Sequence, residues 1–97
     1  MRIISKSTLV EYYTREPKAK VALLSWYAKV KNAEWSCFAD IKRTFNSVDN
    51  VGNKHYVFNI KGNEYRLIVV IDFTPHRVLI RFVGTHSEYD KIDAATI

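Results

Sequence analysis

Chemically versatile side chains gather in a short segment that follows an apolar run. The run Val78–Val83 stops at Gly84, and the next seven residues, THSEYDK, combine histidine, tyrosine, carboxylates and lysine. Histidine gives or takes protons near neutral pH, and tyrosine or lysine can do so beside positive charge. Cleavage of RNA by its own 2′-hydroxyl needs a base, a cation for the phosphorane charge and an acid for the leaving oxygen. His86, Tyr89 and Lys91 are therefore candidates for phosphodiester chemistry, although His86 can equally be an ordinary loop or helix-start histidine.

Two hairpin turns fix which side chains share a face with this segment. Gly62-Asn63 is a favourable two-residue turn, and Thr74–Arg77 reads as a four-residue turn between strands. The first turn pairs Lys61 with Glu64, Asn59 with Arg66, Val57 with Ile68, and His55 with Val70. The second turn pairs Phe73 with Val78, and Val70 with Arg81. Because cross-strand partners share a face, the sequence predicts one polar and one apolar face.

The predicted polar face carries four residues suited to binding or chemistry: His55, Asn59, Arg66 and Arg81. The opposite face is almost wholly apolar and is expected to receive the helices, with Tyr56, Phe58, Ile60, Tyr65, Leu67, Val69, Ile71, Ile80 and Phe82. Val57, Ile68, Val70, Leu79 and Val83 are expected among the polar residues. Arginine within such apolar strands suits a planar anion such as phosphate. The alternative is that each arginine pairs with a carboxylate such as Asp72 or Asp90.

The first half of the chain is expected to be helical. Thr8 and Glu11 resemble a capping box that opens a helix near Leu9, and Pro17 ends it. Residues 17–32 form a longer helix, and Ser36 can cap a third, short one; residues 46–53 are expected to be a loop. An early strand within Met1–Ser5 can join one edge of the sheet. The fold class is therefore α+β, with two to three N-terminal helices packed on one face of an antiparallel sheet, and residues 1–97 form a single domain.

Composition narrows the kinds of partner and site. The 97 residues carry fifteen Lys and Arg against ten Asp and Glu, a net charge of +5, which favours a polyanionic partner. The single cysteine excludes an intramolecular disulfide. The sequence also lacks the dense cluster of carboxylates that a two-metal nuclease needs. There is no signal peptide and no bilayer-spanning run, so we expect a soluble, cytoplasmic protein. Trp26 and Trp35 can stack on bases, but core packing is the stronger interpretation.

Two motifs at this distance are specific to a known family. HYVFNIKGNEYR and RFVGTHSEYDK together closely resemble the HigB toxins of bacterial toxin–antitoxin modules, within the RelE/ParE-like superfamily. The strongest match runs from Asn53 to Ile92. The resemblance implies a metal-independent mRNA endonuclease that needs no cofactor and cuts messages on translating ribosomes, at the A site. It also implies a cognate HigA-type antitoxin with a helix-turn-helix domain.

The resemblance also implies roles for individual residues. Arg66 and Arg81 correspond to the sheet arginines of the family, expected to bind the phosphate and the transition state. Tyr89 or His86 is expected to be the base, with His55, Lys54 and Lys91 as acid or positioning groups. RNA binding is assigned to Lys54, Asn59 and Lys91. Catalytic residues vary between branches of the superfamily, so the resemblance leaves the identity of the base open.

Two other functions remain compatible with the sequence. One is a non-catalytic inhibitor of the ParE kind, which acts on DNA gyrase by binding. The other is a plain basic module that binds nucleic acid without cleaving it, through salt-dependent phosphate contacts. Substitution of His55, Arg66, Arg81 and Tyr89 distinguishes an enzyme from both, because only the enzyme loses its effect with folding intact.

Overall fold

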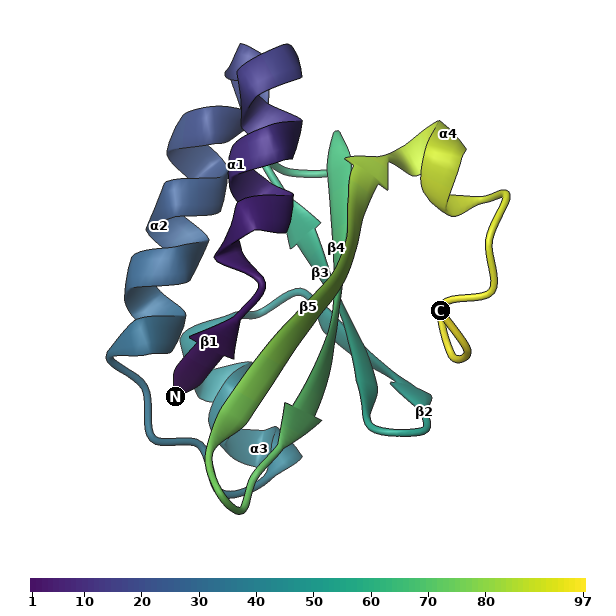
Figure 1. Ribbon diagram of the computed structural model, residues 1–97. Helices are drawn as coiled ribbons and strands as arrows, with labels where there is room; N and C mark the ends of the chain where they lie inside the picture. Colours follow the sequence, from purple (N-terminus) through teal and green to yellow (C-terminus); the bar gives the residue numbers. More distant parts are fainter.

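Five strands form one sheet, and helices cover one side of it. The computed structural model describes residues 1–97 (Figure 1). The strands are β1 (Arg2–Ile4), β2 (Val48–Gly52), β3 (His55–Ile60), β4 (Tyr65–Asp72) and β5 (Arg77–Thr85). Their spatial order is β1-β5-β4-β3-β2, with β1 parallel to β5 and every other pair antiparallel. The predicted α+β class is confirmed, and the early strand does join an edge.

The helices precede most of the sheet in the chain. They are α1 (Lys6–Arg15), the 3₁₀ turn η1 (Pro17–Ala19), α2 (Lys20–Lys31), α3 (Phe38–Thr44) and the short α4 (His86–Tyr89). Pro17 opens η1, as expected for a residue that lacks an N–H. Figure 1 shows α1 and α2 side by side over one face of the sheet. None of these helices combines the length and apolarity needed to cross a membrane.

Two predicted helix starts are wrong. Helix α1 begins at Lys6, directly after β1, with Ser5 in a left-handed conformation at φ 72° and no side-chain cap. Thr8 therefore lies inside the first turn, where its N–H donates to the Ser5 carbonyl, and it cannot form a capping box with Glu11. Cys37, not Ser36, precedes α3, while the Ser36 N–H donates to the Asp40 carboxylate at 2.8 Å. The helices themselves are nevertheless where the apolar periodicity indicates.

The expected loop at residues 46–53 contains the strand that the prediction missed. Val48–Gly52 pairs with β3 and forms the edge farthest from β1. Its sequence, VDNVG, has no strong apolar alternation, so tertiary pairing with β3 rather than local propensity makes it a strand.

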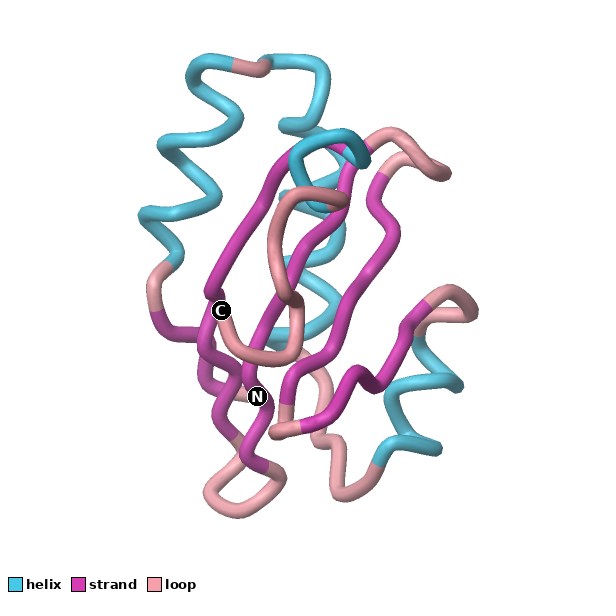
Figure 2. Tube along the Cα trace, turned by 90° about the vertical axis from the view of Figure 1, so that its right-hand side faces the viewer, coloured by secondary structure: helices cyan, strands magenta, loops and turns pink.

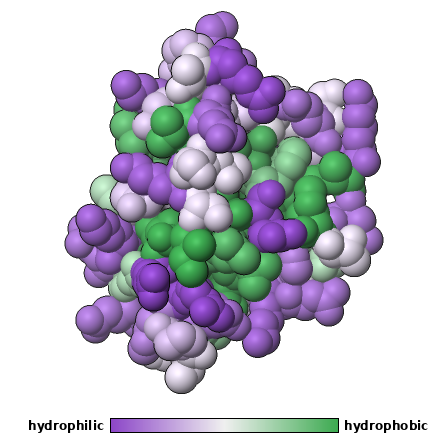
Figure 3. All heavy atoms as spheres, viewed as in Figure 1, coloured by the Kyte–Doolittle hydropathy of each residue, from purple (hydrophilic) through white to green (hydrophobic).

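The core lies between α1, α2 and the helix-facing side of the sheet. Phe58 is its aromatic centre, with ring centroids of Phe45, Trp26 and Trp35 at 5.1, 5.5 and 6.4 Å. Both tryptophans are only 2% exposed, which makes them core residues and not base-stacking residues. Helix α2 buries Leu23, Trp26 and Val30, whereas Val21 is 81% exposed. In Figure 3, hydrophilic residues surround the hydrophobic ones that gather near the middle of the view.

Candidate active site

The side of the sheet that faces away from α1 and α2, here called the open face, carries the candidate site. Its first hairpin has the predicted register: Asn59 pairs with Arg66, and His55 pairs with Val70. Lys61 and Gly62 both adopt positive φ in the connecting turn. Because paired residues share a face, His55, Asn59 and Arg66 lie together on the open face.

The predicted register of the second hairpin is wrong. Asp72 pairs with Arg77 and Val70 with Leu79, so the turn comprises residues 73–76 and not 74–77. A register shift between Ile68 and Val69 then leaves Arg81 without a cross-strand partner. Such a bulge inserts one extra residue and reverses the alternation that follows it.

The bulge exchanges the sides of two residues. Beyond it, Phe82 pairs with Ile68 on the open face, although it was predicted among the helix-facing residues. Val83 pairs with Leu67 and belongs to the core, although it was predicted on the polar face. Arg81 itself is exposed, and its main chain is free of the ladder that constrains the other strand residues.

Neither arginine of the candidate site pairs with an Asp or Glu side chain. Asp72 accepts from Lys54 and Arg77, both at 3.0 Å, and Asp90 pairs with His86 at 3.1 Å. Arg66 instead donates from Nη1 to the carbonyls of Asn63 and Tyr65, at 3.2 and 3.3 Å. Pairing with Asp72 or Asp90 is therefore excluded for both arginines, and no side-chain carboxylate competes with an external anion for either guanidinium.

Arg66 lies against the terminal motif. The carbon of its guanidinium is 5.9 Å from the centroid of the Tyr89 ring. In β5, Gly84 is the residue paired with Arg66, and α4 starts two residues later. The structure therefore brings Arg66 and Tyr89 together from elements more than twenty positions apart in the chain.

A capping box fixes α4 on the end of β5. The Thr85 hydroxyl accepts from the Glu88 N–H at 3.2 Å, and the Glu88 carboxylate accepts from the Thr85 N–H at 2.8 Å. The Thr85 N–H is the main reason that the pKa of Glu88 lies below its usual value. Thr85 and Glu88 thus hold the helix that presents Tyr89. His86 is the first residue of this helix, as its alternative interpretation anticipated, and its ring faces Asp90.

The residues after α4 cross the open face. Figure 1 shows this segment, residues 90–97 and here called the tail, on the side of the sheet opposite α1 and α2, and Figure 2 shows it in front of the strands. Arg81 donates from Nε and Nη2 to the main-chain oxygen of Ile97, at 3.0 and 2.6 Å. Asn53 donates to the Ala95 carbonyl at 3.1 Å. The apolar tail residues Ile92, Ala94, Ala95 and Ile97 are half-buried, whereas the polar ones are exposed.

Of the other predicted site residues, Asn59 lies beside Arg66, whereas His55 and Lys54 lie at the far end of β3. His55 is four residues from Asn59 along β3, or about 13 Å from the row that contains Arg66. Its Nδ1 lies 2.7 Å from the Asn53 carbonyl oxygen, while the Asn59 amide donates to the Ser47 hydroxyl. Lys54 is held by Asp72, and Lys91 is exposed with no ion-pair partner. No group of three or more His, Cys, Asp and Glu side chains is arranged to hold a metal ion.

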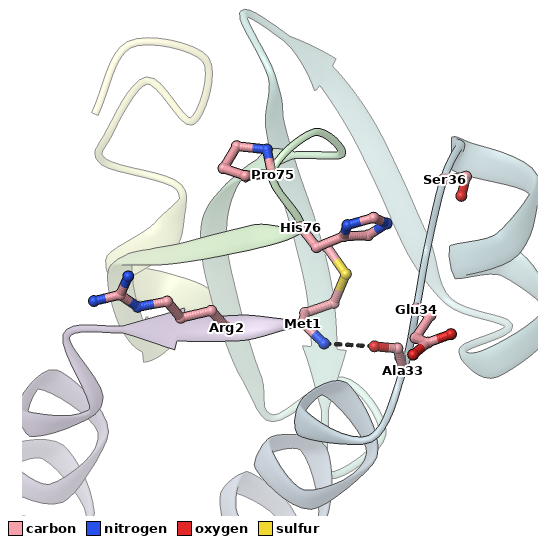
Figure 4. Close-up of a pocket in the computed structure, with 7 residues that line it drawn as sticks. All are labelled: Met1, Arg2, Ala33, Glu34, Ser36, Pro75 and His76. Carbon is pink, nitrogen blue, oxygen red and sulfur yellow. Dashed lines mark hydrogen bonds between the residues drawn. The ribbon is translucent and has the colours of Figure 1, made fainter.

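A pocket elsewhere in the molecule contains none of these residues. It has a volume of about 450 Å³ and is lined by Met1, Arg2, Ala33, Glu34, Ser36, Pro75 and His76 (Figure 4). The amino group of Met1 closes one side by donating to the Ala33 carbonyl. The chemistry-bearing residues therefore lie on an open sheet surface and not in this hollow.

Two features of the site were not predicted from the sequence. Phe82 joined the open face because of the bulge, and the tail placed an oxygen against Arg81. The only local hint of the bulge is the exposed arginine inside an otherwise apolar strand. No local pattern indicated where the tail lies.

Comparison with known proteins identifies the family of the chain. Residues 19–92 match the family model described as HigB toxin, the RelE-like toxic component of a toxin–antitoxin system. The chain is 34% identical over 94 residues to "mRNA interferase HigB" of Escherichia coli O6:H1, covering 95% of this chain and 91% of that protein. It is 33% identical over 96 residues to "mRNA interferase toxin HigB" of Escherichia coli (strain K12), covering 97% and 92%. The chain therefore belongs to the HigB family of RelE-like toxins of toxin–antitoxin systems.

Proposed function

We propose that this toxin is an mRNA endoribonuclease whose site is the open face around Arg66, Arg81 and Tyr89. The observation that carries the proposal is the pair of arginines that no Asp or Glu side chain engages, one of them against Tyr89. Relatives that align over nearly the whole chain are named mRNA interferases, which supports the same activity and substrate. The net charge of +5 suits a polyanion.

The proposed reaction is a transesterification within the RNA. The 2′-oxygen bonds to phosphorus, the bond from phosphorus to the 5′-oxygen breaks, and the products are a 2′,3′-cyclic phosphate and a 5′-hydroxyl. A base takes the 2′-hydroxyl proton and an acid gives one to the 5′-oxygen. Arg66 and Arg81 hold the phosphate and the charge that develops on it. Once the tail gives up Arg81, that guanidinium fork is free for a phosphate oxygen.

Tyr89 is our choice for the base. A phosphate bound to Arg66 would lie near Tyr89, because the guanidinium carbon is 5.9 Å from the centroid of the tyrosine ring. His86 contacts Asp90 through Nδ1, which leaves its Nε2 able to take a proton, so His86 is the second candidate for the base. His55 and Lys91 are assigned to positioning or to the acid role, and Asn59 and Lys54 to RNA contacts at the edge of the face.

The partners follow from the toxin family and the charge. A toxin–antitoxin family implies a cognate antitoxin, which we propose is of the HigA type and presents acidic or amphipathic residues to this basic protein. We further propose that cleavage takes place on translating ribosomes, in the A site. The lysines spread over the helices give the toxin a surface suited to ribosomal RNA.

The decisive experiment maps transcript ends after brief induction. Wild-type toxin should produce new ends carrying a 2′,3′-cyclic phosphate, and Arg81→Ala should lose them. Arg77→Ala is the matched control, because it removes an arginine from the same strand that Asp72 already engages. Toxicity without new RNA ends would instead support a ParE-like inhibitor, and RNA binding without cleavage would support a simple basic module.

A further inference from the structure

One phenylalanine stands apart from the other four. Phe58 is in the core cluster, and Phe38, Phe45 and Phe73 pack against it, whereas Phe82 does neither. Each of those four rings also has an aromatic neighbour, and Phe82 has none. A half-buried aromatic side chain outside the core needs another explanation for its place.

The backbone turns this ring onto the candidate site. The bulge at Arg81 puts Phe82 on the open face, paired with Ile68. Gly84 leaves the room that the ring occupies: a Cβ atom there would lie 2.7 Å from Phe82 Cζ and 3.2 Å from Cε1. Gly84 is in turn the cross-strand partner of Arg66. The ring therefore extends along β5, away from Arg81 and toward the Gly84–Arg66 pair.

An aromatic ring near two arginines is the combination of groups found in sites for single-stranded nucleic acid. Sites for single strands combine cations that follow the backbone with aromatic rings on which bases stack. Arg81 precedes Phe82 in the chain, and Arg66 faces the glycine under the ring. No Asp or Glu side chain pairs with either arginine, so none is placed there to repel a phosphate.

We propose that Phe82 is the base-stacking residue of the toxin, which packs on a base next to the scissile phosphate. The inference rests on the proposed endoribonuclease function and adds to it how the nucleotide is held. Stacking tolerates any base, so Phe82 sets the position of the cut and the affinity for the message, and it leaves base identity to other contacts.

The test is a double-mutant cycle in which one change removes the ring of Phe82 and the other removes a base of the message. The substrates are short synthetic messages bound to ribosomes, each with one mapped cut site. In each message of the series, one nucleotide beside the cut site is replaced by an abasic nucleotide. Wild-type toxin should lose about tenfold in kcat/KM when one particular base is missing. Phe82→Leu should lose the same amount on the intact message, mainly through KM, and should lose nothing more on that abasic message. Phe82→Trp, which keeps a ring, should restore cleavage.

Two controls keep the result interpretable. Phe73→Leu makes the same change in a half-buried phenylalanine packed on the core, and it should leave kcat/KM unchanged. Thermal unfolding of Phe82→Leu and Phe82→Trp separates lost folding from lost stacking. Full activity of Phe82→Leu, or losses that multiply at every abasic position, would overturn the inference while the endoribonuclease stands. A wild-type toxin that cuts none of these messages would overturn both.

Discussion

The two faces of this sheet are built from the same strands and are covered in different ways. Two helices and the turn between them cover one face, where Phe58, Leu67 and Ile71 are at most 1% exposed. Eight residues of tail cover the other (Figure 2), where Ile68 and Val57 are also almost fully buried. The helix-covered face holds no charged residue, whereas the open face holds Arg66 beside Tyr89. The residues that stabilise the fold are thus concentrated on the helix-covered face. The candidate catalytic residues lie on the open face, under a tail that is easier to displace than two helices.

The largest effect should come from the centre of the helix-covered face. Phe58→Ala removes a ring that touches three other aromatic rings, and we expect the free energy of unfolding to fall by about 3–5 kcal/mol. Denaturant titration followed by tryptophan fluorescence measures this, because Trp26 and Trp35 both lie against Phe58. A loss below about 1 kcal/mol would contradict the central place that we give to this ring.

A change on the open face should have the opposite pattern. Arg66→Ala should lower kcat/KM for message cleavage by about 10²- to 10³-fold, as loss of one transition-state donor does elsewhere. Its unfolding midpoint should hardly move, since Arg66 donates only to two carbonyls near the turn. Arg43→Ala, which removes an exposed arginine paired with Asp40 on α3, is the matched control and should retain full activity. Equal losses in both variants would mean that net charge, and not this site, drives cleavage.

The same contrast explains what the sequence could predict. The α2 region and the first hairpin depend on local signals, namely apolar spacing and the turn at Gly62, and both were predicted correctly. The apolar alternation also separated the two faces, which is why His55, Asn59 and Arg66 were assigned to one side. These features follow from side-chain periodicity, which tertiary contacts reinforce here.

The errors arise where tertiary contacts decide. The bulge at Arg81 is an extra residue that the pairing of β4 with β5 accommodates, and no composition signal precedes it. Strand β2 depends on its partner β3, since VDNVG has little strand propensity of its own. The tail is placed by contacts from Asn53 and Arg81, which lie far back in the chain. The single extra residue of the bulge was therefore enough to exchange Phe82 and Val83 between faces.

Removal of residues 93–97 tests how lightly the open face is covered. The deletion takes away the oxygen that occupies Arg81 and the partner of Asn53, so we expect a loss of about 1–2 kcal/mol in unfolding free energy. Cleavage should become a few-fold more efficient, because Arg81 no longer has to exchange this acceptor for phosphate. Asn53→Ala loosens the tail without shortening the chain and should show a weaker form of both effects. Unchanged cleavage in both variants would show that the tail does not compete with the message.

The support of Tyr89 can be weakened without touching the site itself. Thr85→Ala removes the hydroxyl that caps α4, and we expect a loss of about 1 kcal/mol in stability together with slower cleavage. Thr85→Ser keeps an oxygen at the same place and should retain most of both properties. Circular dichroism and cleavage kinetics on the three proteins measure the two effects side by side. If Thr85→Ala cleaves as fast as wild type, the position of Tyr89 does not depend on this cap.

The smallest effect concerns the end of the open face where cations are already neutralised. Hydrogen bonds from Arg77 and then from Lys54 hold the pKa of Asp72 below its ordinary value of 3.8. Since the folded state has the lower pKa, this carboxylate contributes stability above about pH 4, and the contribution disappears as pH falls through the folded pKa. Melting temperatures measured from pH 6 downward should therefore drop less steeply in acid for Arg77→Ala than for wild type. Cleavage at neutral pH should be the same in wild type and in Arg77→Ala, because Asp72 already engages Arg77, whereas Arg66 and Arg81 have no side-chain carboxylate partner. Slower cleavage by Arg77→Ala would mean that the site extends to the end of the open face that holds Asp72.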